Sequence, residues 1–293
     1  MKPARWEDIE RHRGAEPEPI ALDADGHRLV GEHWTAAEDR QGNVILLHGG
    51  GQTRHAWRDT ARLLGLSGWE TIAYDARGHG ESAWRADAAY DQDSLAEDLT
   101  RFAALCATPP VLVGASMGGI TSLIAAAEHP DRFRGLVLVD VAIRVDTVEA
   151  QRVMDFMSAH LNGFPDLSAA AAAVQAYNPG RPRPPSAEGL KRNVAQRTDG
   201  RWYWRWDPRL LEQKPRSALE ERLRDAARCI AIPTLLVRGK RSQMITAEGL
   251  AEFQDCVPHA KVAEIGAGHM VAGDDNDAFS AAITAFLAGL TGS

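Results

Sequence analysis

Short apolar runs recur along this sequence, each three to five residues long and mostly bounded by Gly, Pro or charged residues. They lie at residues 44–47, 71–74, 111–113, 136–139 and 234–237, and the strand pattern continues at 261–265. Runs this short and rich in β-branched residues are typical of strands buried on both faces of a parallel sheet. Because helical segments separate them, the alternation predicts an α/β fold with right-handed crossovers and a doubly wound sheet.

Two further strands are predicted before the first of these runs. Residues 20–24 and 28–34 flank Asp25-Gly26, a pair typical of a hairpin turn. Together with the six later runs, they predict an eight-stranded, mostly parallel sheet that begins with two antiparallel strands.

A helix is predicted before the third parallel strand, and another at the end of the chain over 277–287. Ser94 and Glu97 have the spacing of a capping box and predict where the first of these helices begins. Its apolar face is formed by Leu95, Leu99, Phe102 and Leu105.

The strand pattern stops after Val141 and resumes only at Thr234. The segment between contains an amphipathic stretch, an Ala-rich helix, a Pro-rich connector and a Trp-rich run. We therefore predict a mostly helical insertion over residues 143–228, called the insertion below. The sheet domain is predicted to comprise residues 1–142 and 229–293.

Charge and cysteine content exclude several classes of protein. Forty acidic residues against 33 basic ones give a formal net charge of −7, which disfavours non-specific nucleic-acid binding. No apolar stretch approaches the roughly 20 residues that span a bilayer, and the charged first residues predict no secretory signal. Three widely separated cysteines predict neither a disulfide framework nor a metal site. We expect a cytoplasmic protein that acts on a small molecule without cofactor or metal; its oligomeric state is not predicted.

The most specific local motif is GASMGG at 114–119, directly after the predicted strand 111–113 and before a helical run. A G-x-S-x-G pattern in this context predicts a nucleophile elbow, a tight turn that exposes the Ser116 hydroxyl above the sheet. Small residues at Gly114 and Gly118 permit the close backbone approach that such a turn needs. The alternative is a Gly-rich turn in which the serine only caps the helix.

Three further motifs join this one, and together they resemble the α/β-hydrolase superfamily. They are HGGG at 48–51, DARGHGES at 75–82 and GAGH at 266–269. The resemblance covers about residues 20–142 and 230–290 and keeps the family's motif order. It implies an α/β-hydrolase fold in which the insertion is a helical cap that follows the sixth strand.

The resemblance also implies an oxyanion hole made of two backbone N–H groups. One comes from the residue after the nucleophile, which is Met117, and the other from the loop after the first parallel strand, which is Gly50. Glycine suits this loop because it lets the backbone turn its N–H inward. His48, just before the loop, is interpreted as a residue that positions it by hydrogen bonding.

Among the ten histidines, His269 is the predicted general base, because it alone follows a late strand within a Gly-rich loop. His259 is expected on the surface, and His79 is expected to be structural.

The acidic member of the triad departs from the commonest family pattern. The segment RGKRSQ at 238–243 places Gln243 where many relatives carry an Asp. The family's other location is the end of the preceding strand, which here runs into Asp140. We assign Asp140, which keeps the order Ser, Asp, His. Asp146 and the pair Asp274/Asp275 remain alternatives, and Asp140 could instead be only a cap.

The loop with the glycine run at 49–51 is called the oxyanion loop below. The substrate pocket is predicted to include Gly51 of this loop, Trp57 after it, and Trp204 and Trp206 from the insertion. The alternation of Trp202, Trp204 and Trp206 suggests an aromatic wall over the substrate. The competing interpretation is that these rings pack the insertion onto the sheet domain.

The predicted activity is hydrolysis of a small carboxylic ester or lactone through an acyl-enzyme. A C–C bond hydrolase and a cofactor-free perhydrolase, often labelled a haloperoxidase, are alternatives with the same triad. A ligand-binding receptor on a hydrolase fold is a non-enzymatic alternative, disfavoured by an intact triad.

Overall fold

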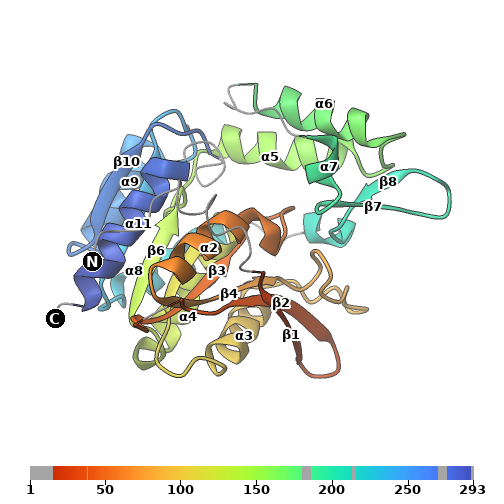
Figure 1. Cartoon of the computed structure of the whole chain (residues 1–293). Helices are drawn as coiled ribbons and strands as arrows, with labels where there is room; N and C mark the ends of the chain where they lie inside the picture. Colours follow the sequence, from red (N-terminus) through yellow and green to blue (C-terminus); the bar gives the residue numbers. More distant parts are fainter. Residues whose placement is uncertain (1–15, 38, 180–185, 213–215, 270–275, 292–293) are drawn as a thin grey trace.

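The architecture is an eight-stranded sheet between two layers of helices (Figure 1). In this computed structural model the described residues are 16–37, 39–179, 186–212, 216–269 and 276–291. The sheet order is β1-β2-β4-β3-β5-β6-β9-β10. Its strands are β1 (Glu18–Asp23), β2 (Arg28–Trp34), β3 (Gly42–Leu47), β4 (Trp69–Asp75), β5 (Val111–Ala115), β6 (Gly135–Val139), β9 (Thr234–Gly239) and β10 (Lys261–Ile265).

The predicted eight-stranded, mostly parallel sheet is confirmed. The pairs β1–β2 and β2–β4 are antiparallel, and every later pair is parallel. The central strands β4 and β6 are buried throughout, because helices cover both faces. Their continuous apolar runs therefore reflect burial on two sides.

Each face of the sheet has its own apolar core. One core includes side chains from α3 (Gln92–Ala103), α4 (Met117–Glu128), α8 (Arg216–Arg228) and α9 (Ala247–Cys256). The other includes side chains from α2 (Arg58–Leu66) and α11 (Asn276–Thr291). Over the described ranges, no helix is long and apolar enough to cross a membrane.

The start of α3 differs from the capping-box prediction. Its N-cap is Asp91, whose carboxylate accepts the Ser94 N–H at 3.0 Å, so Ser94 lies within the first turn. Both residues are good caps, and Asp91 starts the helix three residues earlier. Leu105 lies beyond the helix and is 49% exposed, so it does not extend the apolar face.

The insertion folds beyond the carboxyl end of β6 (Figure 1). It comprises α5 (Thr147–Ala159), α6 (Leu167–Tyr177), α7 (Ala187–Leu190), η3 (Pro208–Leu211) and a hairpin of β7 (Val194–Gln196) and β8 (Trp202–Trp204). These elements share a core that includes Phe164, Val194 and Trp204.

Two features of the insertion were not predicted. The first is the β7–β8 hairpin, in which β8 contains Trp202 and Trp204. Each of its strands has three residues, which is too short for a hairpin to be recognised from the sequence. Helix α8 packs on α4 and α9, and its Leu223 and Ala227 join the core of the sheet domain. By packing, α8 therefore groups with the sheet domain although it lies before residue 229.

The strand order also locates a crevice at the carboxyl edge of the sheet. The chain passes from β3 to β4 on one side and then to β5 on the other side of β3. The connections after β3 and β5 therefore diverge, and ligands of open α/β sheets bind where this happens. The predicted oxyanion loop follows β3 and the predicted nucleophile follows β5.

Candidate active site

Ser116 occupies a strained turn between β5 and α4. Its φ of 48° and ψ of −115° lie in a region that side-chain-bearing residues rarely adopt. A Cβ on Gly114 would lie 2.3 Å from the Gly118 carbonyl oxygen, and one on Gly118 would lie 2.5 Å from that of Leu47. Both clashes are with backbone, so the two glycines are what allows the turn to form against β3.

Asp140 lies beside this turn, because the register of β5 and β6 pairs Ala115 with Val139. The Ser116 N–H donates to the Val139 carbonyl at 3.3 Å, so the ends of β5 and β6 are still hydrogen-bonded to each other where the two strands end. Asp140 is fully buried and, like Ser116, has a positive φ of 48°. A strained, buried carboxylate beside a strained serine is typical of a functional site.

The Asp140 carboxylate accepts three hydrogen bonds. Oδ2 accepts from His269 Nδ1 at 2.8 Å and from the Ser242 hydroxyl at 2.5 Å, while Oδ1 accepts from the Gly239 N–H at 3.1 Å. Because a carboxylate only accepts, the bond from His269 requires that Nδ1 carry the proton, which leaves Nε2 as a base. The structure thus brings Asp140 and His269 together as the sequence predicts.

Ser242 and Gly239 are supporting residues that sequence reasoning missed. The Ser242 hydroxyl also accepts the Met244 N–H at 3.2 Å, which fixes its orientation toward Asp140. A Cβ on Gly239 would lie 2.5 Å from the Gly268 carbonyl oxygen, so glycine lets β9 approach the histidine loop. The signal was present in the RGKRSQ segment, whose serine is one position before the expected acid.

Of the alternative acids, Asp146 is the one that lies within the described residues, and its carboxylate is engaged away from His269. Asp146 caps α5 and accepts the N–H groups of Val148 and Glu149, both at 2.9 Å. Gln243 is exposed. Asp274 and Asp275 lie outside the described residues.

The oxyanion loop leaves one amide unused. The Gly49 N–H donates to Gln52 Oε1 at 3.0 Å, and the Gly51 N–H donates to His79 Nε2 at 3.1 Å. The Gln52 N–H is bonded to the Gly49 carbonyl at 3.1 Å. Within the described part of the chain, the Gly50 N–H has no acceptor. Gly50 is therefore the residue of this loop whose N–H is available to an oxyanion, and it is the donor that the family resemblance implies.

The loop and the nucleophile turn lie against each other. A Cβ on Gly49 would come within 3.4 Å of the Ser116 Cβ. Met117 is the first residue of α4, so its N–H is among those that a helix leaves unpaired at its N-terminus. Both predicted donors therefore belong to segments that converge on Ser116.

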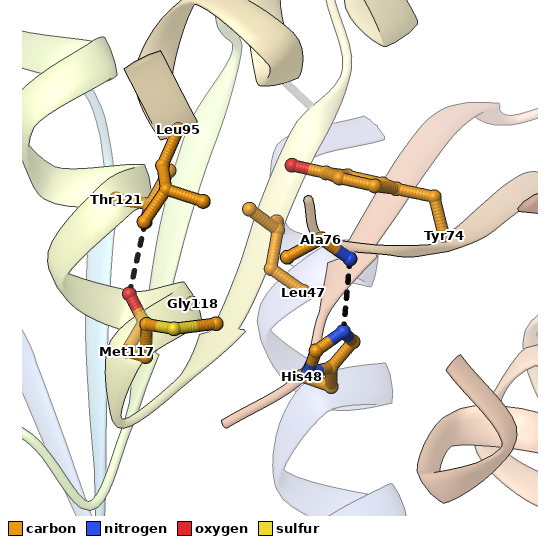
Figure 2. Close-up of a pocket in the computed structure, with 8 residues that line it drawn as sticks. All are labelled: Leu47, His48, Tyr74, Ala76, Leu95, Met117, Gly118 and Thr121. Atoms are coloured by element: carbon orange, nitrogen blue, oxygen red, sulfur yellow. Dashed lines mark hydrogen bonds between the residues drawn. The ribbon is translucent and has the colours of Figure 1, made fainter. Parts of the chain in front are cut away.

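Two buried histidines brace the oxyanion loop. His48 accepts the Ala76 N–H on Nε2 at 3.0 Å, and its Nδ1 lies 2.8 Å from the Gly49 carbonyl (Figure 2). The rings of His48 and His79 meet edge to face, 5.0 Å apart. Burial lowers the pKa of both, and the neighbouring His48 helps to lower that of His79 to about 3. Both rings are therefore neutral braces, as the interpretation of His48 requires.

Beside the turn lies a small cavity of about 10 Å³, which has room for at most one water molecule. Figure 2 shows His48 and Met117 on opposite sides of this cavity, with Leu47 between them. It is too small for a substrate, so it is a packing gap beside the site.

The predicted pocket tryptophans divide into three cases. The prediction for Trp57 is wrong: it is 1% exposed and stacks on Phe279 of α11, with ring centroids 5.9 Å apart, in the core below the sheet. Trp204 packs edge to face on Phe164 within the insertion, which matches the packing interpretation.

Trp206 alone of these rings lies at the oxyanion loop. A Cβ on Gly51 would lie 3.8 Å from Trp206 Nε1 and 3.3 Å from Met157 Cε. The predicted pocket residues Gly51 and Trp206 are therefore neighbours, and Met157 of α5 is a third neighbour that the sequence did not indicate.

Metal ligation has no evident place here. Over the ranges that the structure describes, no group of three or more His, Cys, Asp or Glu residues could hold a metal ion.

Comparison with known proteins agrees with this fold. Residues 42–275 match the family model of the alpha/beta hydrolase fold. The chain therefore belongs to the α/β-hydrolase family, and it is an enzyme of that fold.

Among its relatives, the esterase Rv0045c of Mycobacterium tuberculosis is 32% identical over 239 residues, which is 79% of this chain and 78% of the esterase. The 2-(acetamidomethylene)succinate hydrolase of Mesorhizobium japonicum is 30% identical over 222 residues, 74% of this chain and 78% of that enzyme. A solved structure of the M. tuberculosis esterase superposes with a TM-score of 0.76 at 28% identity and covers 96% of both chains.

Proposed function

We propose that this protein is a serine hydrolase that cleaves a small carboxylic ester or lactone through an acyl-enzyme. The observation that supports this most is the bond from His269 Nδ1 to the buried Asp140, beside the strained Ser116 turn. The M. tuberculosis relative is named an esterase, which favours an ester substrate.

In the proposed mechanism, the Ser116 hydroxyl oxygen attacks the carbonyl carbon while His269 Nε2 takes its proton. Asp140 holds the imidazole in the required tautomer and stabilises the imidazolium that forms. The imidazolium then donates that proton to the departing alcohol oxygen, which leaves the acyl-enzyme. Water attacks the acyl-enzyme by the same proton transfers and releases the acid.

The negative charge on the carbonyl oxygen is proposed to meet the Gly50 and Met117 N–H groups. Loss of one such donor typically costs about 3 kcal/mol of transition-state stabilisation. A free Gly50 amide beside three bonded neighbours supports this assignment, as does the position of Met117 at a helix N-terminus, where the partial positive charge favours an anion.

The insertion is proposed to act as a cap that shapes the substrate pocket. The contacts of Met157 and Trp206 at Gly51 support this role, because they place two elements of the insertion at the oxyanion loop.

A second candidate activity has one specific observation in its favour. The Mesorhizobium relative is named for hydrolysis of 2-(acetamidomethylene)succinate, so a chain this similar can act on a substrate other than a simple ester. A C–C bond hydrolase with the same triad is therefore retained, and bleaching of a coloured ring-fission product would reveal it.

A cytoplasmic setting is also proposed. Cys106, Cys229 and Cys256 are free thiols, and burial raises the pKa of Cys106 to about 12, so this thiol stays protonated and unreactive. Fractionation of cells that produce the protein tests the location.

A fluorophosphonate probe and p-nitrophenyl acetate test the proposed function. We expect one label per chain and measurable ester turnover, with both lost in Ser116→Ala. Ser158→Ala, on the exposed face of α5, is the matched control and keeps both. Labelling that persists in Ser116→Ala would show that another residue is the nucleophile.

A further inference from the structure

His79 lies between the oxyanion loop and the insertion. The residue is fully buried, although sequence reasoning gave it only a structural role. Its Nε2 accepts the Gly51 N–H at 3.1 Å, and its Nδ1 lies 3.2 Å from the Arg77 carbonyl. Because a carbonyl can only accept, Nδ1 must carry the proton and Nε2 must hold the lone pair. The two contacts therefore fix one tautomer.

We propose that His79 is a positioning residue for catalysis, which acts by holding the Gly51 amide so that the adjoining Gly50 N–H is presented to the oxyanion. The inference rests on the proposed function, since it assigns a role within the oxyanion hole of that site.

The loop geometry explains why the Gly51 bond matters. The Gly49 N–H is held by Gln52, and the Gly51 N–H is held by His79, so the backbone on both sides of Gly50 is anchored. Gly51 has a φ of 74°, a conformation open to glycine, and a glycine run has little intrinsic stiffness. Without the His79 acceptor, the backbone on the Gly51 side of Gly50 would lose its anchor.

The insertion in turn holds His79. Its backbone forms an isolated antiparallel bridge with Trp206. On either side, the Gly80 N–H donates to the Arg205 carbonyl at 2.6 Å and the Asp207 N–H donates to the Gly78 carbonyl at 2.8 Å. The segment around residue 206 thus pairs with the DARGHGES motif through one antiparallel bridge.

The side chain of Asp207 adds a further link to the sheet domain. It accepts a hydrogen bond from the Tyr90 hydroxyl at 2.5 Å. The Tyr90 ring packs against Gly78 so closely that a Cβ on Gly78 would lie 2.7 Å from Tyr90 Cε1. The insertion is therefore anchored where it also supports the histidine. Through His79, the position of the insertion is coupled to the geometry of the oxyanion loop.

A matched pair of substitutions separates positioning from packing. In His79→Gln, the Oε1 atom can take the place of Nε2 and accept the Gly51 N–H. In His79→Asn, the side-chain amide can replace Nδ1–H toward Arg77, but no atom reaches Gly51. Both variants remove the ring and leave a side-chain amide, and they differ by one methylene, so most of the packing loss is common to both.

We expect His79→Asn to lower kcat about 10- to 100-fold with KM changed less than twofold, because the anchor acts on the transition state. His79→Gln is expected to recover kcat to within about fivefold of the wild type. Affinity for a boronic acid, whose Ser116 adduct is a tetrahedral anion, should fall in parallel with kcat. The inference would be overturned if kcat fell equally in His79→Asn and His79→Gln, or if His79→Asn folded and kept the wild-type kcat.

A measurement that needs no variant guards against failed folding. Nitrogen-15 NMR of the wild type should show His79 as the neutral Nδ1–H tautomer at pH 7, and a protonated Nε2 would contradict the inference. His259→Asn, on an exposed loop, is the control and keeps wild-type kcat. If the wild type neither binds the fluorophosphonate nor turns over ester, the proposed function has failed. Normal labelling with an unaffected His79→Asn would refute only the positioning role.

Discussion

The carboxyl edge of the sheet and the insertion that covers it are built in different ways. At the sheet edge, backbone geometry fixes each functional residue: glycines at 114, 118 and 239 leave no room for a Cβ, and Ser116 and Asp140 are strained. In the insertion, a core of aromatic and aliphatic side chains determines the structure.

This difference has consequences for tolerance to change. A Cβ that meets a carbonyl oxygen at 2.5 Å cannot be accommodated without moving a strand, whereas an aromatic core can repack. Substitutions at the sheet edge should therefore reduce chemistry on every substrate. Substitutions in the insertion should change which substrates are preferred.

Among substitutions that test this difference, Asp140→Asn at the sheet edge is expected to lower kcat the most. An amide cannot accept all three hydrogen bonds in the same way, and it stabilises the wrong tautomer of His269. We expect kcat to fall about 10⁴-fold. The matched control is Gln243→Ala, at the exposed position where many relatives carry the acid, which should keep full activity. Steady-state kinetics on p-nitrophenyl acetate decide, and the reverse ranking would move the acid away from Asp140.

Ser242→Ala should have a smaller effect at the same place. It removes the 2.5 Å bond to Asp140 Oδ2 but leaves the bonds from His269 and Gly239. We expect kcat to fall about tenfold, because a hydrogen bond to a charged group is typically worth about 1.5 kcal/mol or more. Ser242→Thr, which keeps a hydroxyl, should recover most of the loss. A loss as large as that of Asp140→Asn would mean that Ser242 takes part in the chemistry itself.

The fold was predictable because its signal is local. Each buried central strand of the sheet contains a continuous apolar run, and the motifs at 48–51, 75–82 and 114–119 directly follow such runs. The same holds for Ser116 and Asp140, which end two adjacent strands, and for His269, which follows the last strand.

Contacts between segments far apart in the sequence were not predictable in this way. Ser242 reaches Asp140 across 102 positions, and the pair formed by Gly51 and His79 spans 28 positions. Trp57 illustrates the opposite error: an aromatic residue near a site motif was assigned to the pocket, but its ring packs on Phe279 of the last helix. Helix α8 was assigned to the insertion because it precedes β9, while its apolar face joins the core of the sheet domain.

The histidine pair also predicts a pH dependence of stability. Burial holds the pKa of folded His79 near 3, whereas an unfolded histidine has a pKa of about 6.5. As the pH falls below about 6.5, the unfolded chain binds a proton that the folded chain does not. The free energy of unfolding should therefore decrease from pH 7 toward pH 3.

Urea unfolding at pH 7.5, 6 and 5 measures this slope. His79→Gln removes the titrating group and should give a shallower dependence than the wild type. His259→Gln, at an exposed position, should leave the slope unchanged. An identical slope in His79→Gln would show that other groups account for the acid sensitivity.

The smallest expected effect distinguishes two tryptophans of the insertion. Both belong to the core of the insertion, but Trp206 also lies beside Gly51 at the oxyanion loop, whereas Trp204 packs on Phe164. If the insertion sets substrate choice, Trp206→Phe should change the ratio of kcat/KM between a short-chain and a longer-chain p-nitrophenyl ester about three- to tenfold, because one methylene in a pocket is worth at least about 1 kcal/mol. Trp204→Phe should lower the melting temperature by a few degrees and leave that ratio unchanged. Equal effects on the ratio would mean that the insertion acts as one packed body, and its substrate contacts would then have to be sought among other residues.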